Sequence, residues 1–171
     1  ILPTYNRAGW LADALHSLTQ QQTGDKFEFE IVVCDNASSD ETAEVVAAAA
    51  AMSSQVPIRY CFQSEVGDAP TRNRALQEAT GEWLAFFDDD QFAPENWLSE
   101  LMSAAEKTSG AIVGGAVQLE LTADQRSEFG SSICEALRET DLYPQLQPYL
   151  QRALPGTGNA LVARTVFDAI G

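Results

Sequence analysis

Apolar residues follow two spacings along the chain, and their alternation predicts strands and helices in turn. Short uninterrupted apolar runs predict strands at residues 1–2, 29–34, 57–62, 83–87, 111–121 and 160–163. Apolar residues three or four positions apart predict helices at residues 7–18, 39–52, 72–79, 94–105, 124–138 and 165–170. This order predicts an α/β fold, with a Rossmann-like three-layer α/β/α arrangement and a mostly parallel central sheet.

The strand predicted at residues 83–87 ends directly in three consecutive carboxylates, Asp88, Asp89 and Asp90. Because a buried and unpaired charge is very unfavourable, the chain must leave the core where Asp88 begins. In open α/β sheets, ligands bind beyond the carboxyl ends of the strands. The three acids are therefore a candidate site for a metal or a cationic partner. The alternative is a solvated acidic turn at the end of a strand.

Two other predicted strands also end in polar residues. Asp35 follows the second strand, and the turn of Pro3, Thr4 and Tyr5 follows the first. In a doubly wound sheet, these strand ends would converge on one edge beside the three acids. The glycine patterns of dinucleotide-binding folds and of P-loops do not occur at the first strand, so those two kinds of site are unsupported.

The charge of the chain narrows the classes of partner. Ten Lys and Arg against 25 Asp and Glu give a formal net charge of −15. Such a surface repels nucleic-acid backbones and anionic lipids, so no nucleic-acid partner is expected. Any bound phosphate would need a few placed arginines, helix N-termini or a divalent cation.

Local patterns give smaller predictions. Ser38 followed by Glu41 has the form of a capping box for the next helix. Adjacent glycines at 114 and 115 permit a bulge or a close backbone approach. Three well-separated cysteines indicate buried thiols in a reducing compartment rather than a disulfide framework. No apolar stretch approaches the length of a membrane span.

Four segments, taken in order, resemble the family 2 glycosyltransferases, whose members have the GT-A fold. They are residues 3–7, 30–40, 72–75 and 81–90, and residues 156–161 look like the family's acceptor-side segment. Together they cover nearly the whole chain. Within the family, residues 72–76 combined with the triple acid look most like the bacterial exopolysaccharide glucosyltransferases of the succinoglycan type.

The resemblance implies an activity and a cofactor. Members of the family transfer a sugar from a nucleotide diphosphate donor, here expected to be a UDP-sugar, to an acceptor hydroxyl with inversion. The expected acceptor is a saccharide or a lipid-linked saccharide. Mg²⁺ or Mn²⁺ is the expected cofactor, because a divalent cation held by carboxylates neutralises the leaving diphosphate.

The residues that match the family's motifs carry the roles that the resemblance implies. Asp90 and Asp88 would hold the metal, and Asp89 would lie near the donor ribose or sugar. Asp35 would accept a hydrogen bond from the imide N–H of uracil. The loop expected to line the nucleotide consists of Pro3, Thr4 and Tyr5, where Tyr5 would stack. Arg72 would lie near the diphosphate, and Arg7 is also expected to bind the donor.

Purely structural roles are the alternatives for three of these residues. Asp35 could cap the helix that begins near residue 39, and Tyr5 could pack in the core. Arg72 could pair at the surface with Glu78 or Glu65. The chain is expected to be a single domain, residues 1–171, truncated at both ends. No general base is assigned, since the family's base is expected beyond Gly171.

Two other functions compete with glycosyl transfer. One is a non-catalytic nucleotide-sugar or glycan-binding module of the same fold. The other is a nucleotidyltransferase, which is disfavoured because residues 3–7 do not form a glycine-rich, basic phosphate loop. The expected location is cytoplasmic, and lipid-linked acceptors would add peripheral contact with the inner face of the membrane. The transferred sugar and the oligomeric state stay open.

Overall fold

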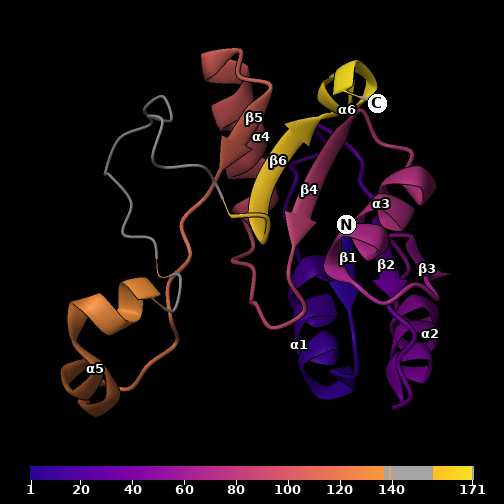
Figure 1. Cartoon of the computed structure of the whole chain (residues 1–171). Helices are drawn as coiled ribbons and strands as arrows, with labels where there is room; N and C mark the ends of the chain where they lie inside the picture. Colours follow the sequence, from indigo (N-terminus) through magenta and orange to yellow (C-terminus); the bar gives the residue numbers. More distant parts are fainter. Residues whose placement is uncertain (137–138, 140–155, 171) are drawn as a thin grey trace.

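The structure is a computed structural model that describes residues 1–136, 139 and 156–170. Strands and helices alternate along the chain (Figure 1). The strands are β1 (Leu2–Thr4), β2 (Ile31–Asp35), β3 (Ile58–Phe62), β4 (Trp83–Phe87), β5 (Ile112–Gly114) and β6 (Asn159–Ala163). The helices are α1 (Ala8–Thr19), α2 (Thr42–Met52), α3 (Asp68–Glu78), α4 (Trp97–Thr108), α5 (Ala123–Ala136) and α6 (Arg164–Ile170). Residues 137–138 of the predicted fifth helix lie outside the described residues.

The central sheet is built from two halves. β1, β2 and β3 are parallel, whereas β6 lies between β4 and β5 and is antiparallel to both. Two backbone hydrogen bonds join the halves, from Ile1 N to Ala85 O at 2.8 Å and from Phe87 N to Ile1 O at 3.1 Å. This pair has the pattern of a parallel ladder. Of the described strands, only β6 therefore runs against the others, and the prediction of a mostly parallel sheet is confirmed.

Helices cover both faces of the sheet, because alternate residues of each strand point to opposite sides. Val33 of β2 packs with Leu15 of α1 and Val46 of α2, whereas Cys34 packs with Ala75 of α3. The clusters around β4 and β6 add α4 to the first face and α6 to the second. The three-layer α/β/α arrangement is thus confirmed, with α1, α2 and α4 on one side and α3 and α6 on the other.

β5 is much shorter than the strand predicted at residues 111–121. Its pairing with β6 ends where Gly115 N donates to Asn159 O at 3.0 Å and Asn159 Nδ2 donates to Ala116 O at 2.5 Å. A Cβ on Gly115 would lie 2.7 Å from the amide atoms of Asn159, so the predicted close backbone approach is confirmed there. The side chain of Asn159 therefore takes the carbonyl oxygen of Ala116, which a longer strand would have paired with backbone.

The predicted capping box at Ser38 and Glu41 is wrong. α2 begins at Thr42, and its first donors go to Asp40, whose Oδ1 accepts Thr42 N at 3.2 Å and Thr42 Oγ1 at 2.5 Å. The hydroxyl of Ser38 instead accepts the backbone N–H of Asn6 at 2.9 Å. A contact between distant segments therefore replaces the local one.

The structure agrees with the prediction of buried thiols. Cys34, Cys61 and Cys134 are buried free thiols. Among the described residues, none of the helices combines the length and the apolar character needed to cross a bilayer.

Candidate active site

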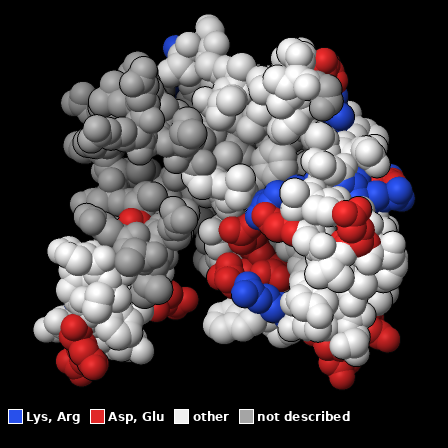
Figure 2. Space-filling model, in the orientation of Figure 1, with Lys and Arg blue, Asp and Glu red and all other residues white. Residues whose placement is uncertain are grey.

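The carboxyl ends of β1, β2 and β4 meet at a cleft of about 300 Å³. Figure 2 shows acidic and basic side chains gathered around a hollow on the face drawn there. The residues that line the cleft come from three strand ends and from the start of α3: Pro3, Thr4, Tyr5, Arg7, Asn36, Asp68, Thr71, Arg72, Asp88, Asp89 and Asp90. The predicted convergence of strand ends on one acidic site is therefore observed for all of the predicted residues except Asp35.

Asp89 is the buried centre of the cleft, with 5% of its surface exposed. Its Oδ2 accepts the hydroxyl of Thr4 at 2.7 Å, and its Oδ1 accepts Arg7 Nη1 at 3.0 Å. Burial raises the pKa of Asp89, and the bonds from Thr4 and Arg7 act against that shift. The charge of Asp89 in turn raises the pKa of Arg7. A buried carboxylate is thus held in place by a hydroxyl and a guanidinium.

Asp90 and Asp88 lie on either side of this centre, and each is held by an arginine. Arg7 Nη1 also donates to Asp90 Oδ2, at 2.8 Å. Arg72 Nη2 donates to Asp88 Oδ1 at 2.8 Å, and its Nε donates to both oxygens of Asp68 at 2.9 and 3.0 Å. Arg72 therefore pairs with acids of the cleft, and not with Glu78 or Glu65 as in the structural alternative.

The segment that follows residue 155 packs directly against Asp88 and Arg72. Arg72 Nη1 donates to the carbonyl oxygen of Thr157 at 3.3 Å. A Cβ on Gly158 would overlap the Oδ2 of Asp88, so only a glycine leaves room for this carboxylate. The part of the chain that resembles the family's acceptor side thus lies against Asp88, one of the two predicted metal ligands.

Tyr5 and Asp35 occupy contrasting positions at this edge. Tyr5 is 52% exposed and lines the cleft, so it is not a core aromatic. Asp35 is only 2% exposed, and its oxygens accept Ser38 N at 2.9 Å and the hydroxyl of Tyr60 at 2.7 Å. Asp35 lies beside Thr4 in the parallel register, at the same edge of the sheet. Its assignment to the donor base stays a prediction. Asp35 does not cap α2, because that helix begins at Thr42 and Asp35 accepts the N–H of Ser38, which precedes it.

Three residues of the cleft were not predicted from the sequence: Asn36, Asp68 and Thr71. Asn36 holds the loop before α3, because its Oδ1 accepts Gly67 N at 2.8 Å and its Nδ2 donates to Glu65 O at 2.8 Å. Of these three residues, only Asp68 could have been found from the sequence. It precedes Arg72 by four residues, the spacing at which opposite charges pair on a helix. Asn36 acts through contacts with a distant part of the chain, whereas the hydroxyl of Thr71 donates to Gly67 O within the first turn of α3.

The charge of the cleft bears on whether a metal fits there. Two arginines and four aspartates line it, so its formal charge is −2 when all are ionised. Among the residues that the structure describes, no three His, Cys, Asp or Glu side chains form a metal-holding group by themselves. Mg²⁺ is commonly bound by one or two carboxylates, with substrate phosphates and water completing the shell. Asp88 and Asp90 fit that donor set, with the phosphates as the missing ligands.

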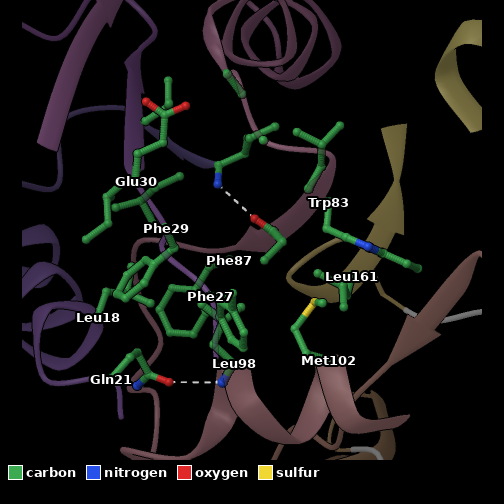
Figure 3. A pocket seen from close by; sticks show the side chains of 18 of the residues that line it. Leu18, Gln21, Phe27, Phe29, Glu30, Trp83, Phe87, Leu98, Met102 and Leu161 are labelled. Carbon is green, nitrogen blue, oxygen red and sulfur yellow. Dashed lines mark hydrogen bonds between the residues drawn. The ribbon is translucent and has the colours of Figure 1, made fainter. Parts of the chain in front are cut away.

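A second cavity, of about 410 Å³, lies where β1, β2 and β4 begin, at the other end of these strands (Figure 3). Its lining is mainly apolar and includes Phe27, Phe29 and Trp83. Three glutamates, Glu28, Glu30 and Glu82, also line it, and Glu30 already accepts Thr80 N at 2.7 Å and lies 3.3 Å from Arg59. We therefore assign the chemistry to the smaller cleft, where unlike charges and polar strand ends converge.

The whole chain, residues 1–171, matches the family described as glycosyl transferase family 2. Succinoglycan biosynthesis protein ExoM of Rhizobium meliloti (strain 1021) is 29% identical over 171 residues, which are 98% of this chain and 52% of that relative. The resemblance to succinoglycan-type exopolysaccharide proteins is thus confirmed. The chain spans about half the length of this relative.

Two solved structures show the same fold. The mannosyltransferase PcManGT from Pyrobaculum calidifontis, in complex with GDP-Man and Mn²⁺, superposes with a TM-score of 0.67 at 24% identity, over 99% of this chain and 45% of that one. TarS 1–349 of S. aureus, in complex with UDP, has a TM-score of 0.57 at 27% identity, over 66% of this chain and 32% of that one. The predicted GT-A fold is confirmed, and the chain belongs to glycosyl transferase family 2.

Proposed function

We propose that the chain forms the donor-binding part of an inverting, metal-dependent glycosyltransferase. It would move a hexose from a UDP-sugar to a hydroxyl of a saccharide or lipid-linked acceptor, in polysaccharide or glycoconjugate synthesis. The observation that carries this proposal is the convergence of Asp88, Asp89 and Asp90 with Arg7 and Arg72 in one cleft. Membership of the family supports nucleotide-sugar chemistry for that cleft.

The charge of the cleft favours a cation as part of the site. A nucleotide diphosphate is strongly negative, and it would enter a cleft whose own formal charge is −2. Asp88 and Asp90 would hold Mg²⁺ or Mn²⁺, which neutralises charge on the leaving diphosphate when bound. The solved structure of PcManGT is a complex with GDP-Man and Mn²⁺, which supports this choice of cofactor.

The side chains around the acids suit the other parts of a UDP-sugar. The guanidinium of Arg72 can bind two oxygens at once, which suits a diphosphate. Tyr5 is exposed at the cleft, where its ring can stack on a base. Asp35 would recognise uracil, and this role requires its bond with the hydroxyl of Tyr60 to open or to be shared. Pro3 and Thr4 would line the nucleotide.

The acceptor would approach from the side of residues 156–158, because that segment lies against Asp88 and Arg72. Asp89 would lie close to the donor ribose or sugar. Its buried position makes it a support for the two outer acids rather than an exposed ligand. We assign no general base.

Isothermal titration of UDP into the chain in the presence of Mn²⁺ tests the proposal. We expect binding that requires Mn²⁺ and that is lost in Asp90→Ala, because this variant removes a metal ligand. Asp13→Ala is the matched control, since Asp13 is exposed on α1 and does not line the cleft. Absence of UDP binding, or binding unaffected by Asp90→Ala, would contradict the donor site. Turnover of UDP-glucose by the whole protein separates an enzyme from a binding module.

A further inference from the structure

One nitrogen of Arg7 serves two carboxylates. Nη1 donates to Asp89 Oδ1 at 3.0 Å and to Asp90 Oδ2 at 2.8 Å. The guanidinium therefore lies between the buried centre of the cleft and the outer acid. It is the cationic group found on Asp90 in this structure.

The two ends of this contact differ in how firmly they are held. Asp89 is buried and also bound by Thr4, so separating Arg7 from it would leave a buried charge with less compensation. The side chains of Arg7 and Asp90 are 50% and 48% exposed, and ion pairs that are exposed to water contribute little. The contact with Asp90 is thus the one that can open.

A divalent cation and this guanidinium would share one carboxylate, that of Asp90. Mg²⁺ and Mn²⁺ take carboxylate oxygens as ligands, and Asp90 Oδ2 is already the acceptor for Arg7 Nη1. Two cationic groups on one carboxylate oxygen would also repel each other strongly at such a short distance.

We propose that Arg7 is an internal counter-cation for the metal site. In the structure its guanidinium lies on Asp90, and a divalent cation would bind by displacing it from Asp90 while the contact with Asp89 persists. Arg7 is then a positioning residue that lowers the affinity for metal alone and keeps the acids together until the donor arrives. This inference rests on the proposed function only in taking Asp90 as a metal ligand.

The test is the binding of Mn²⁺ alone, without nucleotide, followed by the electron paramagnetic resonance signal of free Mn²⁺. We expect Arg7→Gln to bind Mn²⁺ roughly three- to tenfold more tightly than the parent chain, because a weak ion pair and one local positive charge are removed. Arg126→Gln is the matched control. It changes the net charge equally at an ion pair with Glu139 that does not line the cleft, so its Mn²⁺ affinity should stay the same.

Two further measurements make the test specific. In an Asp90→Asn background, Arg7→Gln should no longer change Mn²⁺ affinity, since the two residues act on one another. In the parent chain, the side-chain ¹⁵Nε–¹H signal of Arg7 should shift on addition of Mg²⁺, whereas that of Arg126 should not. This readout holds even if Arg7→Gln does not fold.

Equal or weaker Mn²⁺ binding by a folded Arg7→Gln variant would overturn the inference, as would an Arg7 signal unmoved by saturating Mg²⁺. A general loss of structure would weaken metal binding, so a gain in affinity cannot come from damage. If UDP still binds with Mn²⁺ while Arg7→Gln has no effect on Mn²⁺ alone, only this inference fails. If neither Mn²⁺ nor UDP binds, the proposed function fails with it.

Discussion

The hydroxyl of Thr4 donates to Asp89 Oδ2 at 2.7 Å across a sequence separation of 85 residues, and both groups are buried. This bond ties the end of β1 to the end of β4, next to the point where Ile1 and β4 share backbone hydrogen bonds. The acids of the cleft are therefore fixed to the middle of the sheet, and their position depends on a side chain from the first strand.

Thr4→Val should destabilise the protein while keeping its shape. The change removes the hydroxyl and leaves a buried carboxylate oxygen of Asp89 without that donor. We expect a loss of about 1–3 kcal/mol in the free energy of unfolding, the usual consequence of an unsatisfied buried polar group. Urea denaturation measures it. Thr4→Ser keeps the donor and should lose much less, and equal losses in the two variants would contradict this explanation.

Gly158→Ala should weaken metal-dependent donor binding. Its new methyl group would overlap Asp88 Oδ2 and approach the side chain of Gln91, so the carboxylate must move. We expect UDP affinity in the presence of Mn²⁺ to fall at least about tenfold, or about 1.4 kcal/mol. Gly156→Ala is the matched control, because no atom lies within 4 Å of a Cβ at that position. Similar affinities for both variants would show that Asp88 adapts.

Arg72→Lys should impair the cleft although the positive charge is kept. Arg72 uses its planar group to reach Asp68, Asp88 and Thr157 at once, and an ammonium cannot reproduce that geometry. We expect UDP affinity with Mn²⁺ to fall by about tenfold, and unfolding stability to fall by about 1 kcal/mol. The same substitution at Arg126, which pairs with Glu139 at the surface, should leave UDP affinity unchanged.

Asp40 should give the protein a stabilising contribution that depends on pH. Its carboxylate accepts Ala8 N at 3.0 Å at the start of α1, as well as the two donors of Thr42. The bonds from Thr42, followed by the one from Ala8, lower the pKa of Asp40. A lowered folded pKa means that this stability is present above the ordinary Asp pKa of about 3.9 and is lost as the pH falls through the folded pKa.

The comparison of the parent chain with Asp40→Asn isolates this contribution from that of the other carboxylates. We expect the parent chain to be the more stable protein at about pH 7, and the difference to shrink towards about pH 3. Unfolding by urea at a series of pH values measures it. A difference that stays constant over this range would mean that the charge of Asp40 does not act on the two helix starts.

The elements of the fold were predictable because they depend on local pattern. The apolar run of β4 and the acids that follow it indicated both a buried strand and the point where the chain leaves the core. The direction of β6 was not predictable in the same way, since its antiparallel position between β4 and β5 depends on pairing between distant segments. The short length of β5 was not predictable either, because its pairing with β6 ends at a contact with the distant residue Asn159.

The residues of the cleft were predictable from strand ends, but their partners were not. Arg72 was placed near the diphosphate, yet its bonds to Asp88 and Thr157 connect parts of the chain that no local spacing relates. Arg7 was expected to bind the donor, and the structure shows it on Asp89 and Asp90. The local signal at Ser38 was misleading for the same reason, since Asn6 uses its hydroxyl.

Consecutive carboxylates after β4 are distributed to two different layers of the molecule. Asp88 meets Arg72 of α3 on one side, and Asp89 meets Thr4 and Arg7 on the side of α1. Both acids follow Phe87, the last residue of β4, so the turn that begins at Asp88 separates them. The length of this turn therefore decides which acid meets which arginine. Gain or loss of a single residue there would change the partners of the acids, even if every layer of the fold survived.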